Sequence, residues 1–157
     1  MPEATLASAR ASMSNAQVSL ATAQDSLTNA VTNADAALTT AEQSYTTAQN
    51  ASQSSWIGLM TAQASYCGNL NHLVDVCQLT DIPLTATKID QLVTEIRTPA
   101  TASVGTAAQA LINANNSYGT SRNSLATADK NLTTARDNRA KLNDPATSMT
   151  LLQLRAA

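Results

Sequence analysis

The chain contains no phenylalanine, and its aromatic residues are limited to one tryptophan and three tyrosines. Charged residues make up only 13% of it, whereas about 25% is usual for soluble domains. Glycine and proline occur four times each. An ordinary globular core needs many large branched and aromatic side chains, so these shortages argue against a conventional globule for 157 residues.

Several functional classes are disfavoured by the same shortages. There is one histidine, and no Gly-rich phosphate loop or Ser-His-Asp arrangement, so we expect neither an enzyme nor a cofactor. The net charge of −2 leaves no basic stripe for nucleic acid. No run of about 18 apolar residues exists, and the start Met-Pro-Glu-Ala-Thr-Leu lacks a basic segment followed by an apolar one. We therefore expect no stable membrane insertion, no transmembrane segment and no signal peptide.

Alanine and small polar residues are abundant instead. The chain has 30 alanines and 60 residues of Ser, Thr, Asn and Gln. No proline occurs between Pro2 and Pro83, and the first glycine is Gly58. Alanine is the best helix former, while proline and glycine are the worst. The sequence therefore predicts one long helix over about residues 3–66 and a second over about 100–142.

A seven-residue repeat runs through both predicted helices. In the first helix, every seventh residue is large from Leu6 to Leu27 and alanine from Ala34 to Ala48. The residue three places after each of these is small, from Ala9 to Ala51. In the second, the ladder from Val104 to Leu132 is again followed by small residues. Large and small residues alternating in this way are typical of closely packed coiled-coil helices. The predicted fold is thus all-α, with Leu/Ala heptads in both arms.

The two predicted arms carry opposite charge. Residues 3–66 have a net charge of −3, whereas residues 86–143 have a net charge of +3. Complementary charge favours pairing of the arms. We predict a long antiparallel coiled-coil hairpin with a small helical head at the turn. Its parts are arm 1–66, apolar head and turn 67–98, arm 99–143 and apolar C-terminal tail 144–157.

Further apolar residues beside the first ladder indicate a partner. Val18, Val31, Leu38 and Tyr45 widen the stripe beyond what two helices would cover. The prediction is a multi-helix bundle formed with another copy or another helical structural protein; the alternative is that head and tail cover the stripe in a monomer. The predicted interface comprises Leu6, Met13, Leu20, Leu27, Val31, Leu38, Tyr45, Leu111, Tyr118, Leu125 and Leu132.

The predicted head contains most of the branched residues and both cysteines. Its expected core, read from helical spacing, is Leu70, Leu73, Val74, Ile82, Ile89, Leu92 and Ile96. Cys67 and Cys77 flank His72 at equal distances. A disulfide would need the chain to reverse at Gly68-Asn69 and would stabilise the fold by roughly 2–3 kcal/mol. Two buried thiols, or a metal site with Asp75 as the nearest further donor, are the alternatives; we predict the disulfide.

Trp56-Ile57-Gly58 resembles the W-x-G tripeptide of the small secreted helical hairpins called WXG100 proteins. The resemblance covers three residues. In that family the tripeptide lies in the turn between two helices, whereas here it precedes the predicted turn. The resemblance implies a secreted helical hairpin that acts as an effector or export substrate.

Heptads, low charge and few aromatic residues together favour a non-enzymatic structural protein that works by assembly. The composition resembles that of virion and extracellular-filament proteins, and a bacteriophage particle is the predicted setting. Two alternatives are a secreted W-x-G-like effector, which a stable monomer would favour, and a membrane-active helical protein, which liposome leakage would reveal.

Overall fold

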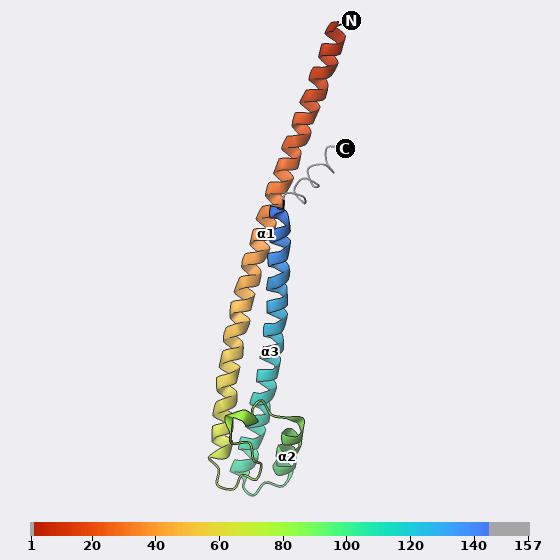
Figure 1. Ribbon diagram of the computed structural model, residues 1–157. Helices are drawn as coiled ribbons and strands as arrows, with labels where there is room; N and C mark the ends of the chain where they lie inside the picture. Colours follow the sequence, from red (N-terminus) through yellow and green to blue (C-terminus); the bar gives the residue numbers. More distant parts are fainter. Residues whose placement is uncertain (1, 145–157) are drawn as a thin grey trace. The chain divides into compact units, whose positions relative to one another are not determined.

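The computed structural model describes residues 2–144, and all of its regular elements are helical (Figure 1). They are α1 (Pro2–Cys67), the 3-10 turn η1 (Leu79–Asp81), α2 (Ala86–Arg97) and α3 (Ala102–Asn143). No strand occurs within these described residues. The predicted all-α class is therefore confirmed. Nearly all of the predicted apolar tail lies outside the described residues.

Helix α1 extends over 66 residues because nothing in its sequence interrupts it. Pro2 and Glu3 suit its first turn, where proline loses no hydrogen bond and a carboxylate meets the positive end of the helix dipole. Its many threonines are accommodated by the helix itself: the hydroxyl of Thr39, for example, donates to the carbonyl of Asp35 at 3.0 Å. The helix ends at Cys67, where Gly68 begins a turn.

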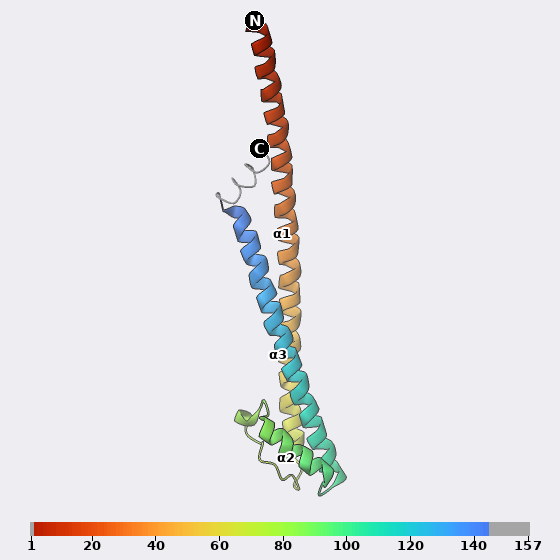
Figure 2. The ribbon, with the colours of Figure 1, turned by 90° about the vertical axis from the view of Figure 1, so that its right-hand side faces the viewer.

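The chain forms two compact units, each with one segment of α1 and one of α3. Unit 1 comprises Met1–Gln43 and Lys130–Ala157, and unit 2 comprises Ser44–Asp129. In each unit the two helix segments pack side by side in opposite directions (Figures 1 and 2). In unit 1, Asp35 pairs with Arg139, and Glu42 lies 4.0 Å from Arg136. These pairs join the acidic arm to the basic arm, although exposed ion pairs contribute only about 0–1 kcal/mol each.

The main core belongs to unit 2 and lies where α1 ends and α3 begins. Helix α2 contributes Leu92, and the segment between α1 and α2 contributes Val74 and Val76. The fully buried large side chains of the core are Tyr66, Leu59, Leu92, Leu111, Val76 and Val104. Within residues 2–144, the region rich in branched residues thus closes the end of the helix pair in unit 2.

Two members of the predicted head core are not in it. Leu70 is 100% exposed and Leu73 is 75% exposed, whereas Val74, Ile82 and Leu92 are buried and Ile89 and Ile96 are partly buried. The prediction assumed a helix over residues 70–77, but the chain has no helix there. Val74 and Val76 point inward and their neighbours outward, which is the alternation of an extended segment.

The register of the α1 ladder also differs from the prediction. Between residues 31 and 55, the partly or fully buried positions are 31, 34, 38 and 41 in unit 1 and 45, 48, 52 and 55 in unit 2, whereas Ala23, Leu27 and Ala30 keep the predicted register. Val31, Leu38 and Tyr45 are therefore inward-facing, not flanking, while Ala37, Ser44 and Ala51 are exposed. Val31, Leu38 and Tyr45 lie four residues after ladder positions, and their side chains bury more apolar area than the small residues three places after those positions. The helix therefore directs this face inward. These three side chains do not by themselves require a further partner.

Candidate functional site

The first turns of α1 carry an apolar ladder that no other described part of the chain covers. Every residue from 2 to 18 is exposed. Leu6, Met13 and Leu20 are 52%, 61% and 53% exposed, and Val18 is exposed beside them. Residues seven apart lie on one face of a helix, so the first three form a single row. We call Leu6, Met13 and Leu20 the exposed ladder.

The remaining predicted interface residues pack within the chain. On α1, the side chains of Leu27, Val31, Leu38 and Tyr45 are partly buried. On α3, Leu111 and Leu132 are buried, while Tyr118 and Leu125 are partly buried. The predicted interface residues thus fall into two groups: those that are buried or partly buried within one chain, and the exposed ladder.

Cys67 and Cys77 form a disulfide that joins the end of α1 to the extended segment after it. Their Cα atoms are 5.8 Å apart. The reversal that this bond requires is made at Gly68 and Asn69, where the amide of Asn69 donates to the carbonyl of Tyr66 at 3.1 Å. His72 lies within the closed loop, with Nε2 3.4 Å from the Cys77 sulfur. The loop therefore brings three potential metal ligands together.

A buried polar network holds the same segment from the inside. The hydroxyl of Tyr66 donates to the carboxylate of Glu95, whose other oxygen accepts from the amide of Leu73 at 2.9 Å. The amide of Val74 donates to the Tyr66 hydroxyl at 3.0 Å. Burial and the hydrogen bond to Glu95 raise the pKa of Tyr66 to about 12. The hydroxyl consequently stays protonated and donates at any physiological pH.

Gln63 completes this network one helical turn before Tyr66. Its side-chain amide donates to the carbonyls of Val76 and Gln78, at 2.6 and 2.7 Å. These bonds satisfy backbone groups of an extended segment that has no neighbouring strand. Within residues 2–144, no buried side-chain nitrogen or oxygen lacks a hydrogen-bond partner.

Sequence reasoning missed Gln63, Tyr66 and Glu95, although one signal was present. Glu95 lies on the apolar face of α2, three residues after Leu92 and next to Ile96. A carboxylate on such a face requires a buried partner. Its partner is a tyrosine 29 residues earlier in the chain, and no local pattern in the sequence identifies it.

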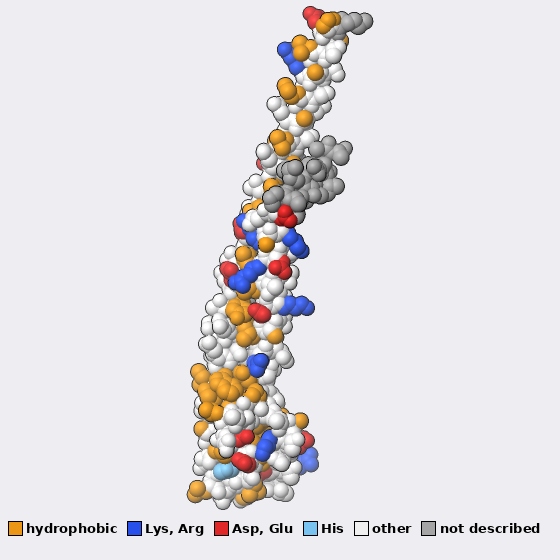
Figure 3. All heavy atoms as spheres, viewed as in Figure 1, with side chains coloured by type: hydrophobic (Ala, Val, Ile, Leu, Met, Phe, Trp, Pro, Cys, Tyr) orange, Lys and Arg blue, Asp and Glu red, His pale blue; other side chains and the backbone are white. Residues whose placement is uncertain are grey.

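The W-x-G tripeptide lies within α1, not in a turn. Trp56 packs against Tyr118 of α3, with ring centroids 5.1 Å apart, and the Arg122 guanidinium lies 5.9 Å from the Tyr118 ring centre. Ile57 is 59% exposed. Figure 3 shows hydrophobic side chains gathered on α1 a short way from its end in unit 2. Trp56 thus serves helix packing, and the tripeptide precedes the turn, unlike its position in WXG100 proteins.

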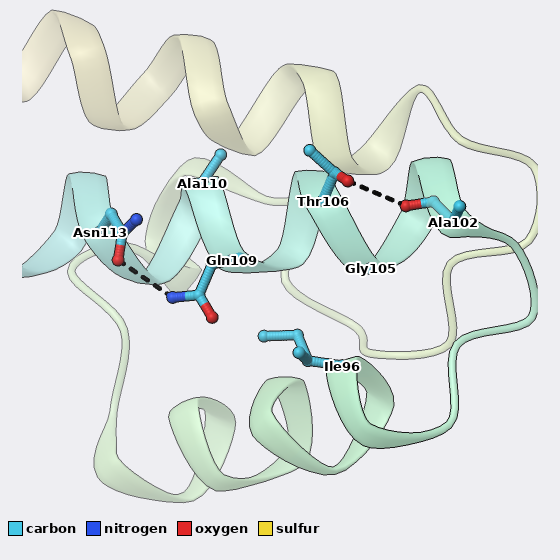
Figure 4. Close-up of a pocket in the computed structure, with 7 residues that line it drawn as sticks. All are labelled: Ile96, Ala102, Gly105, Thr106, Gln109, Ala110 and Asn113. Atoms are coloured by element: carbon cyan, nitrogen blue, oxygen red, sulfur yellow. Dashed lines mark hydrogen bonds between the residues drawn. The ribbon is translucent and has the colours of Figure 1, made fainter.

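A shallow depression of about 510 Å³ lies between the end of α2 and the first turns of α3. Figure 4 shows Ile96 projecting from α2 toward α3, where Gln109 donates to Asn113 at 3.0 Å. The depression is lined by Ile96, Ala102, Gly105, Thr106, Gln109, Ala110 and Asn113. None of these side chains ionises near neutral pH, so this lining offers no charged group for acid–base chemistry.

Comparison with protein-family models, with curated proteins and with solved structures gives no match to the chain. As predicted from the sequence, no helix among residues 2–144 is long and apolar enough to cross a bilayer. The candidate sites are thus the exposed ladder and the disulfide-closed loop, each defined by its own geometry.

Proposed function

We propose that this protein is a non-enzymatic structural component that self-associates through the first turns of α1. One observation carries the proposal: Leu6, Met13 and Leu20 form an apolar row on a helical segment that the rest of the described chain leaves uncovered. The row continues the heptad ladder that the chain uses elsewhere for its own helix packing.

A partner that covers this segment would stabilise its helix. Most helical stability in proteins comes from packing of an apolar face, and residues 2–18 are all exposed. Residues 2–22 contain several Ser, Thr and Asn residues, which are weaker helix formers than alanine. Covering the exposed ladder would supply the missing stabilisation at roughly 25 cal/mol per Å² of apolar surface.

The spacing of the ladder fits a second copy of the same chain. Leu6 and Leu20 are equally far from Met13, so two antiparallel copies related by a two-fold axis would place Met13 against Met13 and Leu6 against Leu20. Such a surface is self-complementary, as two-fold interfaces require. Arg10 would then face the exposed Ala16, and no like charges would meet. This pairing would form a two-helix antiparallel coiled coil over residues 2–22, and the predicted multi-helix bundle would need further copies or another helical protein.

The composition supports a place in a virion or an extracellular filament. Its low charge and its surplus of Ala, Thr, Ser and Asn are shared with proteins of that kind, and the disulfide suits an oxidising environment. A bacteriophage particle is the setting that we propose.

Light scattering of the purified chain tests this function. We expect the mass to rise with concentration from 16.3 kDa toward multiples of that value. Met13→Glu places two like charges at the centre of the pair and should keep the chain monomeric. Asn15→Glu adds the same charge about 200° around the helix and should leave association unchanged.

A wild-type mass of 16.3 kDa at every concentration up to the millimolar range would contradict self-association. Equal effects of Met13→Glu and Asn15→Glu would show that added charge, not the exposed ladder, controls the mass. A stable monomer would instead favour the secreted-effector function.

A further inference from the structure

We propose that Cys67, His72 and Cys77 bind one zinc ion when their disulfide is reduced. One ligand atom from each residue is available, and the three atoms lie within 4.8 Å of one another. Thiolate sulfur and imidazole nitrogen are the ligands that zinc prefers. This site is independent of the exposed ladder and of self-association.

The histidine is already oriented as a metal ligand. Its Nδ1 lies 2.6 Å from the carbonyl oxygen of Asn69, so in the neutral ring Nδ1 carries the proton and donates it to that oxygen. Nε2 is then left with its lone pair, and it lies 3.4 Å from the Cys77 sulfur. Zinc-bound histidines are usually held in this way, with the second ring nitrogen donating to a carbonyl or carboxylate.

The loop does not depend on the disulfide alone for its position. Gln63 binds the carbonyls of Val76 and Gln78 on either side of Cys77. Tyr66, next to Cys67, accepts from the amide of Val74. These bonds keep the two sulfur atoms near each other after reduction. Neighbouring ligand atoms of a tetrahedral zinc ion are about 3.5–3.8 Å apart, which the cluster reaches by a small adjustment.

The site is open to an incoming ion. Cys77 is exposed, whereas Cys67 and His72 are partly buried. Asp75, the further donor suggested by the sequence, is exposed and is not part of the cluster. The fourth position on zinc is therefore filled by water.

Oxidation state decides whether the site exists. Reduction of the disulfide adds two electrons and two protons and gives two thiols; in the test below, a phosphine supplies the electrons and becomes its oxide. Zinc then binds the two thiolates and displaces their protons into solution. In the oxidised protein the sulfur atoms are bonded to each other and are not available as thiolates.

Cobalt absorption tests the proposal on the full-length chain. After reduction, Co²⁺ should give the absorption of a tetrahedral site with thiolate-to-cobalt charge transfer, saturating at one equivalent and abolished by Zn²⁺. The oxidised protein should give none of it. His72→Gln should weaken cobalt binding by at least about tenfold, as loss of a metal-orienting group already costs 10–100-fold. Asp75→Asn, a neighbour outside the cluster, should bind as the wild type does.

Circular dichroism of the reduced chain accompanies the titration. A reduced chain that keeps its helicity and yet gives no tetrahedral cobalt signal would overturn the proposal. So would loss of the fold on reduction, because the proposal requires Gln63 and Tyr66 to hold the loop. Equal affinity of His72→Gln and the wild type would show that the imidazole is not a ligand.

Discussion

At the scale of single residues, buried polar groups fix the path of the segment between α1 and α2 in unit 2. Tyr66 and Glu95 bind each other across 29 residues of sequence, and both also bind the backbone of the segment between them. Gln63 does the same one turn away. A buried polar group with all of its partners specifies one position for the chain, because any other leaves it unsatisfied.

Replacing Tyr66 by phenylalanine should lower the free energy of unfolding by about 1–3 kcal/mol at pH 7, because Glu95 then loses a buried donor. The wild type should also lose stability with rising pH. The pKa of Tyr66 is raised from 10.0 to about 12, so the stabilisation is complete below pH 10 and disappears between pH 10 and 12. Urea unfolding at a series of pH values measures both effects.

The control for this series is Tyr45→Phe, which removes a hydroxyl from α1 outside the network. It should keep the alkaline loss of stability, whereas Tyr66→Phe should flatten it in the same pH window. If both variants lose stability between pH 10 and 12 as the wild type does, Tyr66 is not the group responsible.

At the scale of elements, the long helices and their limits could be predicted from the sequence. Absence of proline after Pro2 allows the full extent of α1, which tolerates Gly58 and ends where Gly68 follows, and Thr98-Pro99 ends α2. The extended conformation of the segment around Leu70 and Leu73 could not be predicted, because the spacing of its apolar residues fits a helix. Its backbone instead forms hydrogen bonds with the side chains of Gln63, Tyr66 and Glu95. The heptad ladder of α1 is partly buried at Leu27, Ala34 and Ala41, as the sequence predicts. From Val31 on, however, the second inward position lies four residues after the ladder and not three, because larger side chains stand there.

Two side chains of similar size near the end of α1, Leu59 and Ile57, differ in burial and therefore test which face of α1 packs against the core. Leu59 is fully buried in the core of unit 2, whereas Ile57 is mostly exposed two residues earlier. We expect Leu59→Ala to lower the free energy of unfolding by about 2–5 kcal/mol, and Ile57→Ala to change it by no more than about 0.5 kcal/mol. Similar losses for both variants in chemical denaturation would contradict the assigned face of α1.

The glycines within the helices give a second prediction for the elements. Gly119 of α3 has open space around it, so Gly119→Ala should stabilise the protein by about 0.5–1 kcal/mol. A Cβ at Gly105 would lie 3.2 Å from Cβ of Pro99, so Gly105→Ala should lose most or all of that gain. Thermal unfolding compares the two variants, and an equal rise in Tm would show that Pro99 does not constrain α3.

At the scale of the whole molecule, the proposed function rests on the apolar side chains that the rest of residues 2–144 leaves uncovered. The sequence could show that apolar heptad positions occur along much of α1. It could not show which of these side chains are buried by other residues of the same chain. The structure separates Val31, Leu38 and Tyr45, which face inward, from Leu6, Met13 and Leu20, which do not. The self-association that we propose therefore rests on fewer residues than the interface predicted from the sequence.

Amide hydrogen exchange measured at several protein concentrations tests this account most directly. If a second copy covers the exposed ladder, amides within residues 2–22 should become more protected as concentration rises, while those of the unit 2 core stay equally protected throughout. Exchange of residues 2–22 at one rate, whatever the concentration, would contradict assembly through this end of α1.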